Sequence, residues 1–63
     1  MKNTRFKFAR IQAGLTQQKL AELSGVREHE ITRFETGRAT PNPEIKKRIA
    51  EILNRPTFEL FDA

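Results

Sequence analysis

The chain has 63 residues, a formal net charge of +4 and no cysteine. This length accommodates one domain, residues 1–63, with a small core, because a domain of about 60 residues buries only about 60% of the surface that its unfolded chain exposes. The lack of cysteine excludes a disulfide framework and a thiolate zinc site. No apolar run follows the basic N-terminus, so we expect no signal peptide, no membrane span and a cytoplasmic location.

Basic residues are concentrated at the N-terminus, and the first ten residues contain four of them and no acid: Lys2, Arg5, Lys7 and Arg10. The sequence pI is about 10.1, and a basic surface attracts polyanions, of which nucleic acid is the most common. Many small domains are equally basic, so the charge by itself indicates a nucleic-acid ligand only weakly.

The glycines and prolines divide the chain into helix-sized segments. The first predicted helix covers roughly Thr4–Ala13 and ends at Gly14, a typical C-terminal stop. One face of it has the helical spacing i, i+3, i+4, i+7 and comprises Phe6, Ala9, Arg10 and Ala13. The second helix starts after Thr16, a good N-cap. It runs to about Leu23, with an apolar stripe made by Leu20, Ala21 and Leu23.

The third predicted helix covers about Arg27–Thr36. Before it, Gly25 tolerates the positive φ of a tight turn, and the small side chain of Ala21 lets two short helices cross steeply. Ile31 and Phe34 anchor the third helix to the core and leave its opposite face outward. This spacing is that of a helix-turn-helix, whose second helix protrudes enough to enter a major groove.

Asn42 as N-cap and Pro43 at the first helical position begin the fourth predicted helix. Its apolar stripe comprises Ile45, Ile49, Ile52 and Leu53, and the run Lys46-Lys47-Arg48 is interpreted as its solvated face. Thr57 is expected to cap a short last helix. No segment alternates with the period of a strand, so we expect an all-α fold: a compact bundle of four to five short helices with a central helix-turn-helix.

A longer pattern extends beyond the turn. It consists of Arg10-Ile11-Gln12-Ala13-Gly14-Leu15-Thr16-Gln17, Leu20-Ala21-Glu22, Ser24-Gly25-Val26, Ile31, Phe34-Glu35 and Gly37. These residues resemble the lambda-repressor and Cro-like (XRE-type) helix-turn-helix family, and the resemblance extends from about Phe6 to Phe61. It implies a transcription regulator, expected to be a repressor, that binds double-stranded DNA as a homodimer. It further implies a prokaryotic or phage-encoded, nucleoid-associated protein with no cofactor and no small-molecule ligand.

The resemblance also implies structural and phosphate-binding roles. Arg10 and Glu35 are expected to form an ion pair that locks the third helix against the first. At the start of the second helix, free N–H groups and the helix dipole suit a phosphate; the alternative there is simple capping by Thr16 and an inert Gln17. The expected phosphate contacts are Thr16, Gln17, Gln18, Thr36, Arg38 and Thr40. For the last two of these, a plain solvated loop is the alternative.

The helical period of about 100° per residue turns one side of the third helix outward, namely Glu28, His29, Thr32, Arg33 and Thr36, and Arg27 borders that side. The residues expected to read bases are Arg27, Glu28, His29, Thr32 and Arg33. Arg33 suits the two acceptors of guanine and Glu28 suits the N4 donor of cytosine. Alternatively, Glu28 and Glu30 only stabilise the positive end of the helix. Arg27 occupies a position where the family commonly has a serine or threonine that caps the helix. A long cation there indicates either a phosphate contact or a solvated side chain.

The apolar C-terminal end supplies candidate dimer contacts, namely Phe58, Leu60 and Phe61. The alternative is that these residues fold back onto Phe6 and Ile52 as ordinary core. We expect no enzyme, because the chain has one histidine, no cysteine and no glycine-rich phosphate loop. We expect no metal site, because His29 lies between two glutamates that point about 100° away from it on a helix. The competing function is a protein-interaction module, such as an antitoxin or adaptor, that retains the helix-turn-helix fold.

Overall fold

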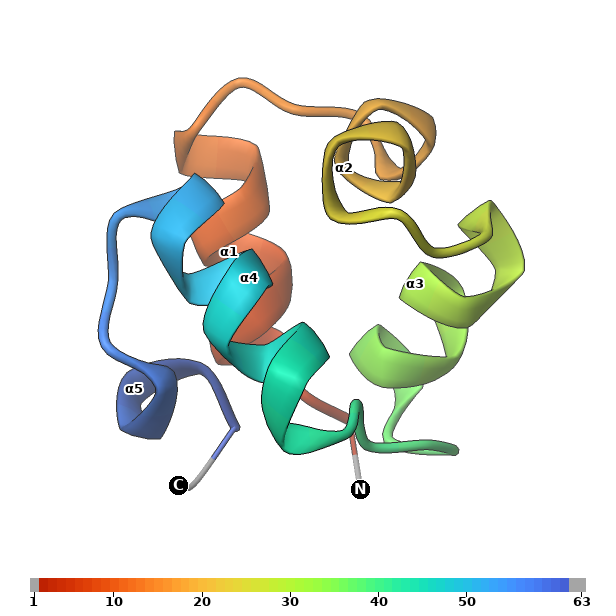
Figure 1. The fold of residues 1–63 in the computed structure, drawn as a ribbon. Coiled ribbons are helices and arrows are strands. Elements are labelled where there is room, and N and C mark those ends of the chain that lie inside the picture. Colours follow the sequence, from red (N-terminus) through yellow and green to blue (C-terminus); the bar gives the residue numbers. More distant parts are fainter. Residues whose placement is uncertain (1, 62–63) are drawn as a thin grey trace.

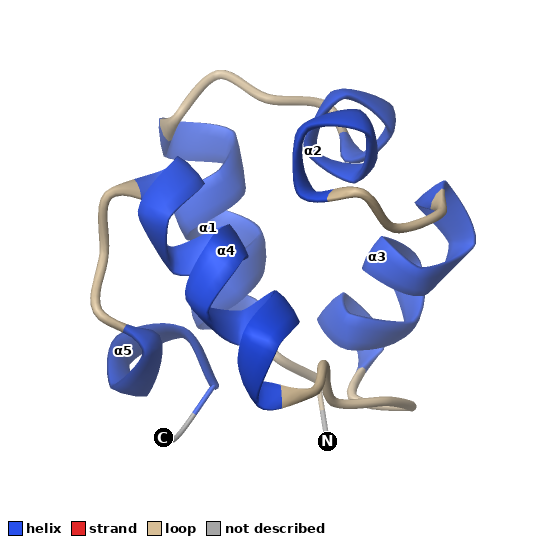
Figure 2. Cartoon of the chain, in the orientation of Figure 1, coloured by secondary structure: helices blue, strands red, loops and turns tan. Residues whose placement is uncertain are grey.

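The computed structural model describes residues 2–61, and its regular elements are helices joined by short loops (Figure 1). In chain order they are α1 (Thr4–Gln12), α2 (Gln17–Ser24), α3 (Glu28–Thr36), α4 (Pro43–Leu53) and α5 (Thr57–Phe61). Figure 2 shows no strand in this part of the chain, which confirms the predicted all-α fold class. No helix among the described residues is long and apolar enough to cross a membrane.

Capping side chains determine where the helices begin. At the start of α1, α2 and α4, a side-chain oxygen accepts a hydrogen bond from the backbone N–H three residues later, at 2.9–3.1 Å. The capping residues are Asn3, Thr16 and Asn42. The N-cap of α3 is Arg27, whose side chain has no acceptor. The Glu30 carboxylate instead accepts from the Arg27 N–H at 3.1 Å, which supplies half of a capping box.

Helix ends also follow local chemistry, with one addition to what the sequence predicted and one difference at the start of the last helix. Gly25 ends α2 at φ 79° and Gly37 ends α3 at φ 77°, in the left-handed region where a Cβ is unfavourable. Asn54 ends α4 in the same region at φ 56°, a role that the sequence analysis did not assign. Thr57, expected as the cap of the last helix, is the first residue of α5.

The core receives one fully buried apolar side chain from each helix. These anchors are Phe6, Leu20, Ile31, Ile49 and Leu60. They meet because α2 packs against α3 and α4, while α1 packs against α3 and α5, and α5 also packs against α4. Burying one large apolar side chain stabilises the fold by about 1.5–3 kcal/mol, so every helix contributes to the same small core.

Two residues of the expected apolar stripes lie elsewhere. Leu23 is 49% exposed, and the buried position at this end of α2 belongs to Ser24, whose hydroxyl donates to the carbonyl of Leu20 at 2.7 Å. Ala13 is exposed at the end of α1. Conversely, Arg48 is more than a solvated cation, because its Nη1 donates to the carbonyl of Ser24 at 2.9 Å and so ties α4 to α2.

The C-terminal end folds back onto the core instead of presenting one apolar face. Leu60 is 2% exposed, and the half-buried Phe61 packs on Phe6 with ring centroids 5.2 Å apart. Phe58 is 60% exposed. Of the three candidate dimer contacts, Leu60 therefore lies in the core, Phe61 packs against the core and stays partly exposed, and Phe58 lies at the surface.

Candidate nucleic-acid interface

α3 lies at the edge of the bundle, buried along one side and open along the other (Figure 1). On the inner side Ile31 is fully buried, and Phe34 and Glu35 are 7% and 6% exposed. The outer side carries the side chains that the sequence predicted to read bases, and all five are exposed: Arg27, Glu28, His29, Thr32 and Arg33. A polar helix held along one side only has the shape that a major groove admits.

A buried polar network holds α3 against α1. Nε of Arg10 donates to Oε2 of Glu35 at 2.6 Å, and the two side chains are 11% and 5% exposed. Nη1 of Arg10 also donates to the carbonyl of Leu15 at 2.6 Å, which ties the loop between α1 and α2 to the same guanidinium. This is the ion pair that the family resemblance implies. Because both charges are hydrogen-bonded, their burial is tolerated.

Gln17 extends this network to the second helix. Its Nε2 donates to Oε1 of Glu35 at 2.9 Å, and its Oε1 accepts from Oγ1 of Thr32 at 3.2 Å. One side chain of α2 therefore contacts two positions of α3, one turn apart. Both ends of the amide are hydrogen-bonded within the protein, so a phosphate contact by Gln17 would use the same atoms that hold α3.

The other expected phosphate contacts differ in how their polar atoms are used. Oγ1 of Thr36 donates to the carbonyl of Thr32 at 3.0 Å, so its hydrogen is engaged. The hydroxyl of Thr16 accepts the capping hydrogen bond of α2, which leaves its hydrogen available to a ligand. Three more are exposed and form no side-chain hydrogen bond within the described part of the chain: Gln18, Arg38 and Thr40.

Two lysines that sequence reasoning did not assign to the site lie next to it. A concavity of about 320 Å³ lies where residues at the start of the chain meet α2 and α3, and its lining includes Lys2, Lys7, Gln17, Thr32 and Thr36. The lysines come from the stretch that precedes the first acid, so the signal was present as charge. Only the packing of α1 against α3 places that charge beside α3.

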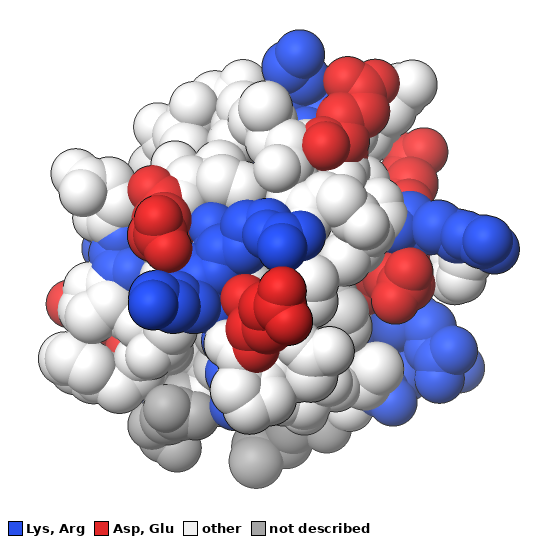
Figure 3. Space-filling view, viewed as in Figure 1, with Lys and Arg blue, Asp and Glu red and all other residues white. Residues whose placement is uncertain are grey.

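The charges around the site are mixed. Figure 3 shows acidic and basic side chains interspersed over the face that carries α4. α3 has two acids in its first turn, Glu28 and Glu30, whereas α1 contains no acid. Lys2 and Lys7 add positive charge from the N-terminal side, beside the exposed arginines at and after α3. Among residues 2–61 no group of three metal-ligating side chains is present.

The amino-acid sequence is similar to those of known proteins. The chain matches the helix-turn-helix family model over residues 6–60, from inside α1 to inside α5. It is also 34% identical over 58 residues to an Archaeoglobus fulgidus protein described as an uncharacterized HTH-type transcriptional regulator. That match covers 92% of this chain and 83% of the relative.

Proposed function

This chain belongs to the helix-turn-helix family, and we propose that it is a transcription regulator that binds double-stranded DNA sequence-specifically through α3. The observation that carries the proposal is the asymmetry of α3, which is anchored by Ile31, Phe34 and Glu35 while its outer face is polar and exposed. The relative described as a transcriptional regulator supports the same function.

The outer face of α3 is assigned to base reading. Arg33 is the cation in the last turn of this face, and its planar fork matches the two major-groove acceptors of guanine. Glu28, in the first turn, matches the N4 donor of cytosine. His29 and Thr32 lie on the same exposed face, and Arg27 borders it.

Contacts to the phosphate backbone flank the reading helix. The start of α2 offers free N–H groups and the positive end of a helix dipole, where an anion is stabilised. Cations near phosphates add affinity by releasing counterions. The residues assigned here are Thr16, Gln17, Gln18, Thr36, Arg38 and Thr40, joined by Lys2 and Lys7 from the α1 side.

Two copies are proposed to act together on one operator. A single recognition helix reads only a few base pairs, too few to mark one site in a genome. A two-fold dimer places its two reading helices about 34–36 Å apart, one turn of DNA. Phe58 is the contact that the C-terminal end keeps exposed. Repression follows most simply from occupancy of the operator, because a domain bound in the major groove excludes other proteins. The proposed site of action is the cytoplasm.

Selection of bound sites from a random duplex library identifies the operator. We then expect Arg33→Ala to lose about 1–3 kcal/mol of affinity for that operator, the value of one bidentate contact to guanine. Affinity for random duplex DNA should change far less. Equal losses on both DNAs would show that Arg33 touches phosphate and reads no base.

Salt separates DNA binding from the function of a protein-interaction module. Affinity for duplex DNA falls steeply as salt rises, because each neutralised phosphate releases counterions. An apolar protein interface lacks this dependence. A titration with random duplex at low and moderate salt that detects no binding at either would reject the proposed function in favour of the interaction module.

Dimeric reading is tested with two operators, one palindromic and one with a scrambled half-site. We expect sigmoidal binding to the palindrome and a large loss of affinity on scrambling. Phe58→Glu should remain folded, since Phe58 is largely exposed, and should lose the cooperativity. If one domain binds each operator with the same isotherm, the dimer proposal is wrong.

A further inference from the structure

The outer face of α1 carries apolar side chains that the fold does not cover. Phe8 is 63% exposed and Ile11 is 50% exposed. Residues three apart lie on the same side of a helix, and this side is opposite to the buried Phe6 and Arg10. The other large apolar side chains exposed among residues 2–61 are Leu23 and Phe58, each on a different helix. Neighbouring exposed apolar residues mark contact surfaces, whereas single ones are ordinary.

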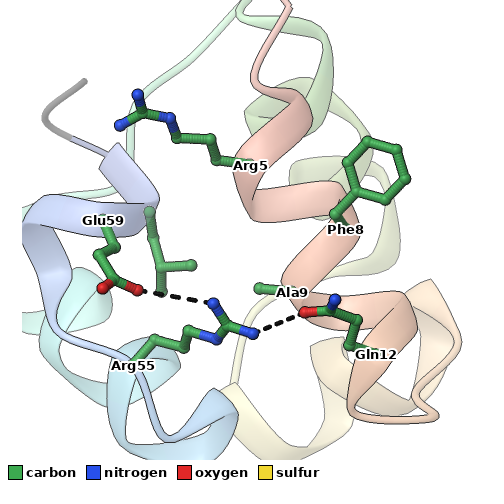
Figure 4. A pocket seen from close by; sticks show the side chains of 7 residues that line it. Arg5, Phe8, Ala9, Gln12, Arg55 and Glu59 are labelled. Atoms are coloured by element: carbon green, nitrogen blue, oxygen red, sulfur yellow. Dashed lines mark hydrogen bonds and ion pairs between the residues drawn. The ribbon is translucent and has the colours of Figure 1, made fainter.

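A groove of about 440 Å³ lies beside Phe8, between α1 and α5. Its apolar lining comprises Phe8, Ala9 and Leu60, of which Ala9 and Leu60 are buried and Phe8 is exposed. Figure 4 shows Arg55 held across the lower part of this groove between Gln12 and Glu59. In the same view the ring of Phe8 points away from that bridge, and the side chain of Arg5 extends from α1 toward the α5 side.

The charge of this surface is unbalanced. Arg55 lies 3.6 Å from Glu59, so these two charges offset each other. Arg5 is exposed and forms no ion pair with any other residue of the described range 2–61. α1 itself contains no acid. A second copy of this chain would bring the same excess of positive charge to the contact. A partner with carboxylates beside its apolar side chains complements both the groove and Arg5.

We propose that the α1–α5 surface, defined by Arg5, Phe8, Ala9, Ile11 and Leu60, docks an acidic amphipathic segment of another protein. One apolar side chain of that segment enters the groove over Ala9 and packs on Phe8, and a carboxylate pairs with Arg5. None of these residues belongs to the set assigned to DNA. The domain can therefore hold its operator and this partner at the same time, which goes beyond the proposed DNA binding.

The probe is a short synthetic helical peptide whose leucine stripe is flanked by glutamates, titrated into the whole ¹⁵N-labelled chain. We expect saturable NMR shifts confined to α1 and α5. Phe8→Gln should bind at least about tenfold more weakly, the loss typical of a residue central to an interface. Leu23→Gln is the matched control, because Leu23 is similarly exposed on α2. It should keep the wild-type affinity.

Charge is tested separately with a peptide that carries glutamine in place of each glutamate. The glutamate peptide should bind several-fold more tightly at low salt, and Arg5→Gln should remove most of that advantage, since exposed ion pairs are weak but screened by salt. Equal binding of the two peptides, an unchanged affinity of Phe8→Gln, or shifts centred on α3 would each overturn the proposal.

Two further outcomes would assign the surface to another ligand. Self-association of the wild type that Phe8→Gln abolishes, measured by sedimentation, would show that a second copy occupies it. A loss of operator affinity in Phe8→Gln, with the melting temperature unchanged, would place Phe8 in the DNA interface. Failure of the wild type to bind DNA would reject the proposed function and leave this surface proposal standing.

Discussion

Two polar bridges, each made of one arginine, one glutamate and one glutamine, join α1 to its neighbours. They differ in how far their charged side chains are exposed. Between α1 and α3, Arg10, Glu35 and Gln17 are linked at 2.6 and 2.9 Å, and the charged side chains are 11% and 5% exposed. Between α1 and α5, Arg55 donates to Gln12 at 2.6 Å and lies 3.6 Å from Glu59. The charged side chains of this second bridge are 42% and 46% exposed.

The difference teaches that burial, and not the types of residue, decides what such a bridge contributes. In water the charges of an exposed pair are screened and its long side chains lose entropy when they are held together, so the pair contributes little. In the interior, a charge without its partner is strongly unfavourable. The inner bridge is therefore required for the orientation of α3, whereas the outer bridge only covers the junction of α1 and α5.

Arg10→Met is expected to have the largest effect. It leaves the carboxylate of Glu35 buried without its cation, which costs about 3–5 kcal/mol. Urea unfolding measures the loss. Any variant domain that remains folded should prefer the same base pairs, because Arg10 is not on the reading face. An unchanged melting temperature would contradict the structural role of the pair.

The double variant Arg10→Met, Glu35→Leu is the control for this interpretation. Replacing both charges with apolar groups of similar size removes the unpaired buried charge, and such replacements are often neutral or stabilising. The double variant should thus be more stable than Arg10→Met alone. If it is less stable, the loss arises from packing of the arginine stem and not from the orphaned carboxylate.

Gln17→Leu is expected to have an intermediate effect. The substitution removes the partner of Oε1 of Glu35 and leaves a buried acceptor unsatisfied, at a cost of about 1–3 kcal/mol. It also frees Thr32 from its bond to α2. Thermal and urea unfolding should both report the loss. Gln18→Leu is the neighbouring control, since Gln18 is exposed and should leave stability nearly unchanged.

Arg55→Met is expected to have the smallest effect, at most about 1 kcal/mol, because its partners are exposed and the ion pair is screened. The same measurement in high salt should show even less difference from the wild type. A loss as large as that of Arg10→Met would break the comparison, since it would show that exposure does not separate the two bridges.

Local structure could be predicted from the residues that determine it. Thr16 and Asn42 start helices because a side-chain oxygen replaces the missing partner of a backbone N–H. Gly25 and Gly37 end helices because they adopt positive φ without strain. The periodic placement of Ile31 and Phe34 correctly indicated the inner face of α3. These signals lie within a few residues of one another, so one sequence is enough to find them.

Positions that depend on distant segments were predicted less well. Leu23 fits the apolar stripe of α2 but lies in solvent, because the neighbouring helices cover the side of Ser24 instead. Arg48 was interpreted as solvated, yet it reaches the carbonyl of Ser24, a residue 24 positions away. The use of Glu30 to replace the missing cap at Arg27 also depends on a side-chain rotamer that periodicity does not specify.

The sequence by itself determined that the chain is an all-α helix-turn-helix with one polar helix face directed outward, because capping, turn formation and amphipathic periodicity act over short distances. Only the tertiary structure decided that Leu60 is buried and Phe61 packs on Phe6 while Phe58 and Phe8 stay exposed. It alone placed Lys2 and Lys7 beside α3 and gave Gln17 both of its partners on that helix. These outcomes depend on how helices far apart in the chain cover one another, and burial is a property of the assembled bundle.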